Sequence, residues 1–162
     1  MDASAGPWTI TWDGKSWSTT GTPAPKSAVL GFQQLSCTSR SFCAGIGGGF
    51  GVSLWIWTSK AWRGTGSAGP SYAEDVSCSS NDFCAVALSN GTARTWIGTR
   101  WSTPRPLIAA THPEAEFQIS CASRTMCMLV YERSAYLYAS DNHGLGHLLQ
   151  PEIEWTRLGH FT

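Results

Sequence analysis

The amino-acid sequence predicts an all-β fold built from tandem four-stranded units of the β-propeller type. Three observations support this prediction. A cysteine pair recurs with its first member at positions 37, 78 and 121, so the period is about 42 residues. A tryptophan pair with four residues between its members recurs in alternation with the cysteines. The 17 glycines and 8 prolines lie mostly between short apolar runs, as turn residues do in all-β chains.

The chain starts with a half-unit, residues 1–31. Trp12 and Trp17 form the tryptophan pair that elsewhere closes a unit, and no cysteine pair precedes them. We therefore interpret this segment as the tail of a unit, and we expect it to contribute strands but no disulfide.

The first full unit is residues 32–72. Strands are expected at 32–37, 43–46 and 52–58, and a fourth starts at 61–63. A run of three glycines ends the second strand, and β-branched and aromatic residues fill the third. These short runs show no helical period, so four strands are predicted for the unit.

The second full unit is residues 73–115. Strands are expected at 75–78, 83–88 and 93–97, with the fourth at Trp101. Asn90 and Gly91 stand between the second and third strands and are a hairpin signal, because both residue types tolerate positive φ.

The last unit, residues 116–162, is degraded and has a divergent tail. Tyr136 and Tyr138 hold its third strand, but no second aromatic residue follows at the repeat spacing. The sequence offers no interpretation of residues 140–162.

The number of units leaves the architecture open in one respect. Propellers typically have four to eight blades, and this chain holds fewer. The units therefore form part of a ring, or a ring completed by copies of the same chain. A β-trefoil, which needs only three lobes of similar size, is the alternative.

The repeat resembles the Cys/Trp repeats of secreted and cell-surface actinobacterial proteins. Residues 77–86 (SCSSNDFCAV), 96–102 (WIGTRWS) and 12–18 (WDGKSWS) carry the likeness. The chain departs from that pattern at Ser59, where the family has glycine, and at Met128, where it has alanine. The resemblance covers roughly residues 8–140 and implies propeller blades and export from the cell. It implies no activity. Residues 11–17 are also faintly similar to the Asp-box turn of sialidase propellers.

All six cysteines fall into pairs with five residues between the members. The predicted disulfides are Cys37–Cys43, Cys78–Cys84 and Cys121–Cys127. A zinc site would require shorter spacings, and redox catalysis would require a single Cys-x-x-Cys motif. Disulfides indicate an oxidising compartment, so we expect a secreted or cell-surface protein. Residues 1–8 lack the basic start and apolar core of a signal peptide.

The tryptophan pairs supply the candidate ligand-binding residues. The first member of each pair is expected in the core. The second follows a polar turn, so its ring is expected to face solvent in part and could stack on a sugar ring. The candidate platforms are Trp17, Trp62 and Trp101.

Charge and motifs exclude several functions. The 11 basic and 11 acidic residues balance, and no basic stripe is visible, so nucleic acid is not an expected partner. No apolar run is long enough for a membrane helix. No nucleophile, nucleotide-binding or metalloprotease motif is present, and no metal or cofactor is expected. His143 and His147 have a metal-ligand spacing, but glycines between them disfavour a helix. The scattered carboxylates, Glu74, Asp75, Asp82, Glu114, Glu116 and Glu132, show no recurrent pairing.

We therefore predict a non-enzymatic binding module outside the cytoplasm, with multivalent carbohydrate recognition as its function. A protein-interaction scaffold, with every tryptophan in the core, is one alternative. A fragment of a sialidase-like glycoside hydrolase, which would need two close carboxylates, is the other.

Overall fold

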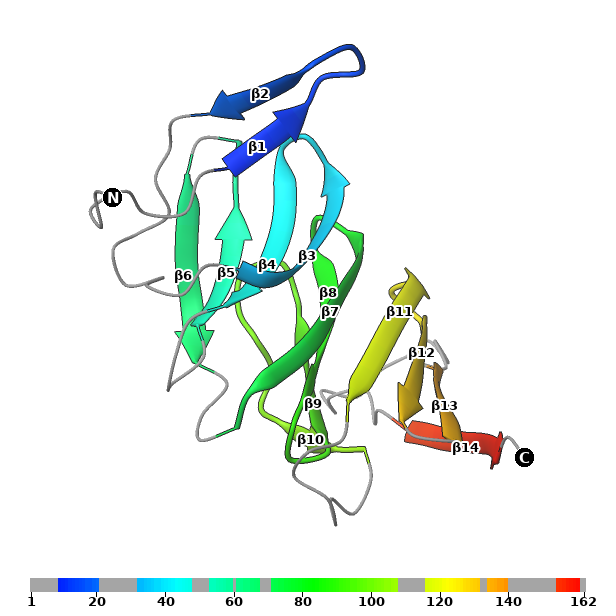
Figure 1. Ribbon diagram of the computed structural model, residues 1–162. Coiled ribbons are helices and arrows are strands. Elements are labelled where there is room, and N and C mark those ends of the chain that lie inside the picture. The colour runs from blue at the N-terminus through cyan, green and yellow to red at the C-terminus, as the bar shows by residue number, and fades with distance from the viewer. Residues whose placement is uncertain are drawn as a thin grey trace, which may run out of the picture.

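The computed structural model describes residues 9–20, 32–47, 53–59, 61–67, 71–107, 116–131, 134–139 and 154–160. All regular secondary structure in these ranges is β-strand, arranged in antiparallel sheets (Figure 1). No helix long and apolar enough to cross a membrane occurs in this part of the chain.

The strands pair in chain order within a two-stranded hairpin and three four-stranded sheets. The hairpin consists of β1 (Thr9–Trp12) and β2 (Trp17–Thr20). Sheet I consists of β3 (Phe32–Ser39), β4 (Phe42–Gly47), β5 (Ser53–Trp57) and β6 (Trp62–Ser67). Sheet II consists of β7 (Ala73–Ser80), β8 (Phe83–Leu88), β9 (Thr92–Trp96) and β10 (Arg105–Pro106). Sheet III consists of β11 (Phe117–Ser123), β12 (Met126–Tyr131), β13 (Ser134–Ala139) and β14 (Glu154–His160).

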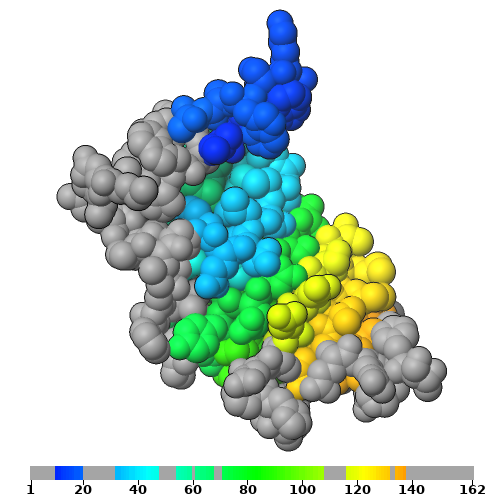
Figure 2. Space-filling model, in the orientation of Figure 1, coloured from blue at the N-terminus to red at the C-terminus, as the bar shows by residue number. Residues whose placement is uncertain are grey.

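The sheets stack face to face in chain order, and Figure 2 shows them as adjacent cyan, green and yellow bands. Two cores fill the gaps between them. The first lies between sheets I and II and includes Ile46, Leu54, Val86 and Leu88, all fully buried. The second lies between sheets II and III and is centred on Leu129, also fully buried. Stacked four-stranded antiparallel sheets are the blades of a partial β-propeller, as predicted, and not the lobes of a β-trefoil.

Strand β8 shows why the fold requires stacking. All six of its residues are buried, because alternate side chains enter the two different cores. Cys84, Val86 and Leu88 face sheet I, whereas Phe83 and Ala85 face sheet III. A strand that is apolar on both faces is stable only between two sheets.

Each cysteine pair joins the first two strands of its sheet. The three predicted disulfides are present, Cys37–Cys43, Cys78–Cys84 and Cys121–Cys127, with Cα–Cα distances of 4.0, 3.9 and 3.9 Å. In every sheet the two cysteines are directly opposite in the register. The disulfides are typical of proteins in an oxidising environment.

The fourth strand of sheet II is broken. Trp101 makes an isolated bridge to Trp96, and β10 then pairs Arg105 and Pro106 with β9. Pro104 lies in the interruption, where it lacks the N–H that a continuous ladder needs, and Pro106 is tolerated because β10 is at the edge of the sheet.

Strand β14 is the element that sequence reasoning missed. It pairs with β13 and places Trp155 opposite Tyr138. This register matches the pairs Trp12–Trp17, Trp57–Trp62 and Trp96–Trp101. The second aromatic residue of the last unit is therefore present in the chain, but a long insertion displaces it from the repeat spacing.

The turn between the two tryptophans has the same backbone feature in three units: a residue with positive φ two positions after the first tryptophan. Gly14 has φ of 100° and Gly98 has φ of 80°, and Ser59 occupies the same position with φ of 65°. In the first turn, Asp13 Oδ1 accepts hydrogen bonds from the Ser16 and Lys15 amides at 2.7 and 2.8 Å. These amides hold the pKa of Asp13 below its ordinary value. Asp13 therefore stabilises the turn between Trp12 and Trp17.

Candidate functional site

The first strands of the three sheets, β3, β7 and β11, lie side by side (Figure 1). The serine before the first cysteine of each unit connects them. Ser36 Oγ accepts a hydrogen bond from the Cys78 amide at 2.8 Å, and Ser77 Oγ accepts one from the Cys121 amide at 2.9 Å. Asp75 Oδ2 adds a third bond, from the Ile119 amide at 2.8 Å. The Ser-Cys signature is therefore a junction between consecutive units.

A second row of contacts joins the turns that follow these strands. Thr38 Oγ1 donates to Asn81 Oδ1 at 2.6 Å, between sheets I and II. Arg124 lies 3.7 Å from Asp82, between sheets II and III. At the equivalent turn of sheet I, Arg40 Nη2 donates to the Asp13 carbonyl oxygen of the hairpin at 3.2 Å. In each case the residue three positions after the first cysteine, Arg40, Asn81 or Arg124, contacts the preceding unit.

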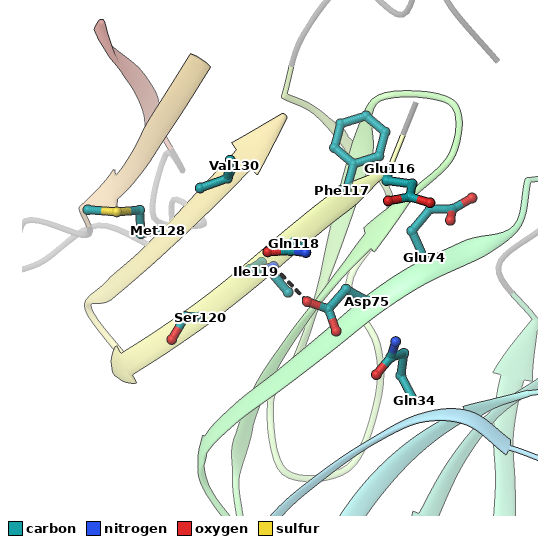
Figure 3. A pocket seen from close by; sticks show the side chains of 10 residues that line it. All are labelled: Gln34, Glu74, Asp75, Glu116, Phe117, Gln118, Ile119, Ser120, Met128 and Val130. Atoms are coloured by element: carbon teal, nitrogen blue, oxygen red, sulfur yellow. Dashed lines mark hydrogen bonds between the residues drawn. The ribbon is translucent and has the colours of Figure 1, made fainter. Parts of the chain in front are cut away.

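A hollow of about 600 Å³ lies where β7 and β11 begin (Figure 3). Polar side chains from three sheets converge on it: Gln34 from β3, Asp75 from β7 and Gln118 from β11. Glu74 and Glu116 point toward each other at its rim. The remaining lining residues are Phe117, Ile119, Ser120, Met128 and Val130. The hollow combines an acidic side with an apolar side.

Burial and charge raise the pKa of Glu74. Desolvation is the larger cause, and the nearby Glu116 carboxylate is the second, because two negative charges disfavour each other. A positively charged group in the hollow would relieve that repulsion. Among the described residues no cluster of His, Cys, Asp and Glu is placed to hold a metal ion.

The three tryptophans predicted to bind ligand differ in how exposed their side chains are. Trp17 is 70% exposed, as expected for a stacking surface. Trp62 and Trp101 are only 7% and 8% exposed, so the expectation that their rings face solvent is wrong. The Trp62 ring packs on Phe32, with centroids 4.3 Å apart. The Trp101 ring lies in the core between sheets I and II, and its Nε1 donates to Thr65 Oγ1 at 2.9 Å.

The physical reasons differ. Trp62 is buried within its own sheet, in a cluster with Trp55 and Trp57, whereas the preceding sheet covers Trp101. Trp101 follows a polar turn in the sequence, yet its ring reaches back to sheet I. The first members of two pairs, Trp57 and Trp96, are buried as predicted. For the hairpin the prediction of a buried first member is wrong, because Trp12 is 49% exposed. Its ring lies 5.5 Å from that of Trp17 between centroids, with an interplanar angle of 47°.

A groove of about 570 Å³ separates this hairpin from sheet I. It is more apolar than the hollow, and Ile10, Trp12, Leu35, Trp57 and Trp62 lie along it. The groove and the exposed tryptophan pair form the second candidate binding surface.

Sequence reasoning named Glu74, Asp75 and Glu116 only as unpaired carboxylates. A signal was nevertheless available, because the residue three positions before the first cysteine is polar in every unit: Gln34, Asp75 and Gln118. That position faces the junction of the first strands. The predicted histidine pair, His143 and His147, lies outside the described residues.

Comparisons with known proteins support the fold. No protein-family model matches the chain, and no curated protein matches it. Among solved structures it is similar to "YCF48 bound to D1 peptide", a β-propeller, with a TM-score of 0.58 and 9% sequence identity. The match covers 89% of this chain and 43% of that one, so this chain spans less than half of that protein. At such low identity the likeness concerns the fold alone.

Proposed function

We propose that the protein is a non-catalytic binding module that takes an extended peptide segment with a basic side chain into the hollow beside β7 and β11. The observation that carries this proposal is the convergence of Gln34, Asp75 and Gln118 from three consecutive sheets, with Glu74 and Glu116 at the rim. Such a fold suits a binding or scaffold module.

The charge and shape of the hollow favour a cation on a flexible stem. The raised pKa of Glu74 marks a carboxylate that is partly buried and lies close to a second one. A guanidinium or ammonium group between Glu74 and Glu116 would offset both burial and repulsion. Met128 and Val130 provide an apolar wall for the stem and for neighbouring residues. The structural neighbour is itself described as bound to a peptide, which agrees with this class of ligand.

The test compares labelled hexapeptides that differ only in one central residue: arginine, lysine, glutamine or glutamate. We expect the basic peptides to bind and the Glu74→Gln/Glu116→Gln double variant to lose about tenfold in affinity, measured by fluorescence anisotropy. Asp82→Asn, which removes an exposed carboxylate outside the hollow, is the matched control. Binding should weaken as the pH falls through the raised pKa of Glu74, because protonation removes its charge. Equal binding of the arginine and glutamate peptides would refute the proposal.

Carbohydrate recognition is the second candidate, and the exposed Trp12–Trp17 pair favours it. Because the rings of Trp62 and Trp101 are buried, the chain does not offer a sugar-stacking surface in every unit. The carbohydrate candidate therefore rests on the single site at the hairpin. A glycan array should then give signals that Trp17→Ala abolishes and Glu74→Gln leaves unchanged. If folded, oxidised protein binds no glycan on the array, carbohydrate recognition is excluded.

We also propose that the module acts outside the cytoplasm, in a secreted or cell-surface protein. The three disulfides support this placement, since such bonds persist in oxidising compartments. The enzymatic alternative, a piece of a glycoside hydrolase, would require Glu74 and Glu116 to flank a glycosidic bond in the hollow, and no observation beyond their proximity favours it.

A further inference from the structure

A cavity of about 550 Å³ lies between sheets I and II, and it shares no lining residue with the hollow at β7 and β11. This volume is typical of small-molecule sites, which measure roughly 300–1,000 Å³. Sheet I contributes Arg63 on β6 and Thr58 after β5, and sheet II contributes Asn81, Trp96 and Thr99. No carboxylate occurs among the described residues that line this cavity, whereas three line the hollow. The two sites therefore favour ligands of opposite charge.

This cavity occupies a place that also exists at the preceding junction, between the hairpin and sheet I. Trp96 lines the cavity and Trp57 lines the groove beside the hairpin, and each is opposite the second cysteine of its unit. Asn81 and Arg40 correspond in the same way, because each stands three positions after the first cysteine. The repeat thus allows the polar groups of equivalent junctions to be compared.

At the other two junctions the polar groups bind one another. Beside the hairpin, Arg40 Nη2 donates to the Asp13 carbonyl oxygen at 3.2 Å, and Trp57 Nε1 donates to the Arg40 carbonyl oxygen at 3.3 Å. Between sheets II and III, Arg124 lies 3.7 Å from Asp82. Both junctions therefore use the arginine at this position in a contact within the protein.

The junction of sheets I and II leaves several donors unused. Trp96 is 5% exposed, and its Nε1 is buried with no hydrogen-bond partner among the described residues. Asn81 accepts a bond from Thr38 through Oδ1 at 2.6 Å, which leaves its NH2 group to donate. Arg63 is exposed and forms no ion pair within the part of the chain that the structure describes. An acceptor bound here would satisfy donors that the protein itself leaves without one.

Hydroxyl groups complete the accessible polar lining. Thr58 and Thr99 are exposed at the cavity. A hydroxyl both donates and accepts, so these threonines suit a ligand that carries hydroxyls of its own. The aromatic members of the lining, Phe42 and Trp96, are only 6% and 5% exposed, so little apolar surface is offered. The lining favours a hydroxylated anion over an apolar acid.

We propose that the cavity between sheets I and II binds a hydroxylated organic carboxylate of the size of one sugar acid. Arg63 and the Asn81 NH2 group hold the carboxylate, Thr58 and Thr99 bind hydroxyls, and Trp96 Nε1 donates to a ligand oxygen. Guanidinium–carboxylate hydrogen bonds are among the strongest in proteins, so they select the charged ligand over its neutral analogue. The inference is independent of the peptide proposal and of the tryptophan pair on the hairpin.

The test titrates D-glucuronate into the oxidised protein and follows the indole N–H signals by two-dimensional proton–nitrogen NMR. D-glucose has the same ring without the carboxylate and is the matched probe. The signal that is missing from Trp96→Phe identifies Trp96. We expect glucuronate to shift this signal until it saturates and glucose to leave it unchanged.

Two variants test the carboxylate contacts. Arg63→Gln and Asn81→Asp should each weaken glucuronate binding about tenfold, because the first removes a charge-assisted hydrogen bond and the second adds a negative charge. Asn81→Asp keeps the oxygen that accepts from Thr38, so its fold should be that of the wild type. Lys15→Gln removes an exposed cation from the hairpin turn and is the matched control, with unchanged binding.

Trp17→Ala separates this cavity from the exposed tryptophan pair, and it should bind glucuronate like the wild type. The proposal is overturned if glucuronate leaves the Trp96 signal unchanged, if glucose shifts it equally, or if Arg63→Gln and Lys15→Gln bind glucuronate with the same affinity. None of these outcomes depends on whether a basic peptide binds in the hollow.

Discussion

The serine that precedes the first cysteine of each unit gains its role from the neighbouring sheet. Ser77 Oγ accepts the Cys121 amide at 2.9 Å, so a small polar side chain on one strand satisfies an edge amide of the next. Ser79, two residues further along the same strand, has a buried Oγ with no hydrogen-bond partner among the described residues. The two serines differ in this respect, although they look alike in the sequence.

We predict that Ser77→Ala lowers the free energy of unfolding by about 1 kcal/mol, because it removes one hydrogen bond and leaves the Cys121 amide without its acceptor. Ser79→Ala should be neutral or slightly stabilising, because it removes an unsatisfied buried hydroxyl. Urea unfolding under non-reducing conditions measures both. Equal losses in the two variants would contradict the junction role of Ser77.

Ser59 occupies a backbone position that favours glycine. Its φ of 65° lies in the left-handed region, where Gly14 and Gly98 stand in the equivalent turns. A side chain with a β-carbon is strained there. Serine in place of glycine at this position therefore lowers the stability of the turn between β5 and β6.

Ser59→Gly should raise the free energy of unfolding by about 0.5–1 kcal/mol through relief of this strain. The reciprocal change, Gly98→Ser, should lower it by a similar amount. Thermal unfolding followed by circular dichroism reports both shifts. A destabilised Ser59→Gly variant would show that the serine side chain makes a compensating interaction.

At the scale of the element, equivalent strands differ in how deeply their disulfides lie. Cys84 is fully buried in the core between sheets I and II, whereas Cys37 is exposed. Both bonds close loops of the same length, with a sequence separation of 6. The two disulfides should therefore contribute equally to stability through chain entropy, and they should differ in how much the packing around them contributes.

Replacement of Cys37 and Cys43 by alanine should cost roughly 2–2.5 kcal/mol in the chain-entropy model. Replacement of Cys78 and Cys84 should cost about 1 kcal/mol more, because it also leaves a small cavity in a packed core. Denaturant unfolding of the two double variants gives the comparison. If the Cys37/Cys43 variant were the less stable of the two, burial would not be the deciding factor.

Strands β8 and β12 illustrate how position in the stack controls a strand of given pattern. Both alternate side chains between two faces, yet β8 is buried on both and β12 on one. The difference follows from what lies beyond each sheet. Alternation in the sequence therefore identifies a strand, but it does not identify which of its faces will be covered.

At the scale of the whole molecule, stability comes from contacts between neighbouring sheets. Among the described residues, the two largest cores are each shared by two units, and a smaller cluster of Trp55, Trp57 and Trp62 belongs to sheet I alone. Such an array behaves as a set of units joined by nearest-neighbour interfaces. The outer surfaces of sheets I and III carry exposed apolar side chains, among them Leu35 and Met126.

The sequence by itself determined the period, the strand class and the disulfide pairs, because these depend on local spacing and on alternation along the chain. Strands β3 to β9 follow from that spacing. Strand β14 does not, since an insertion hides the Trp155 register from any pattern of fixed spacing.

Only the tertiary structure decided which aromatic rings are exposed and which carboxylates meet. Trp101 is buried by sheet I, and Glu74 approaches Glu116 across the junction of sheets II and III. The physical reason is that burial and electrostatic interaction depend on distances between units, which a repeat of residues along one chain does not specify.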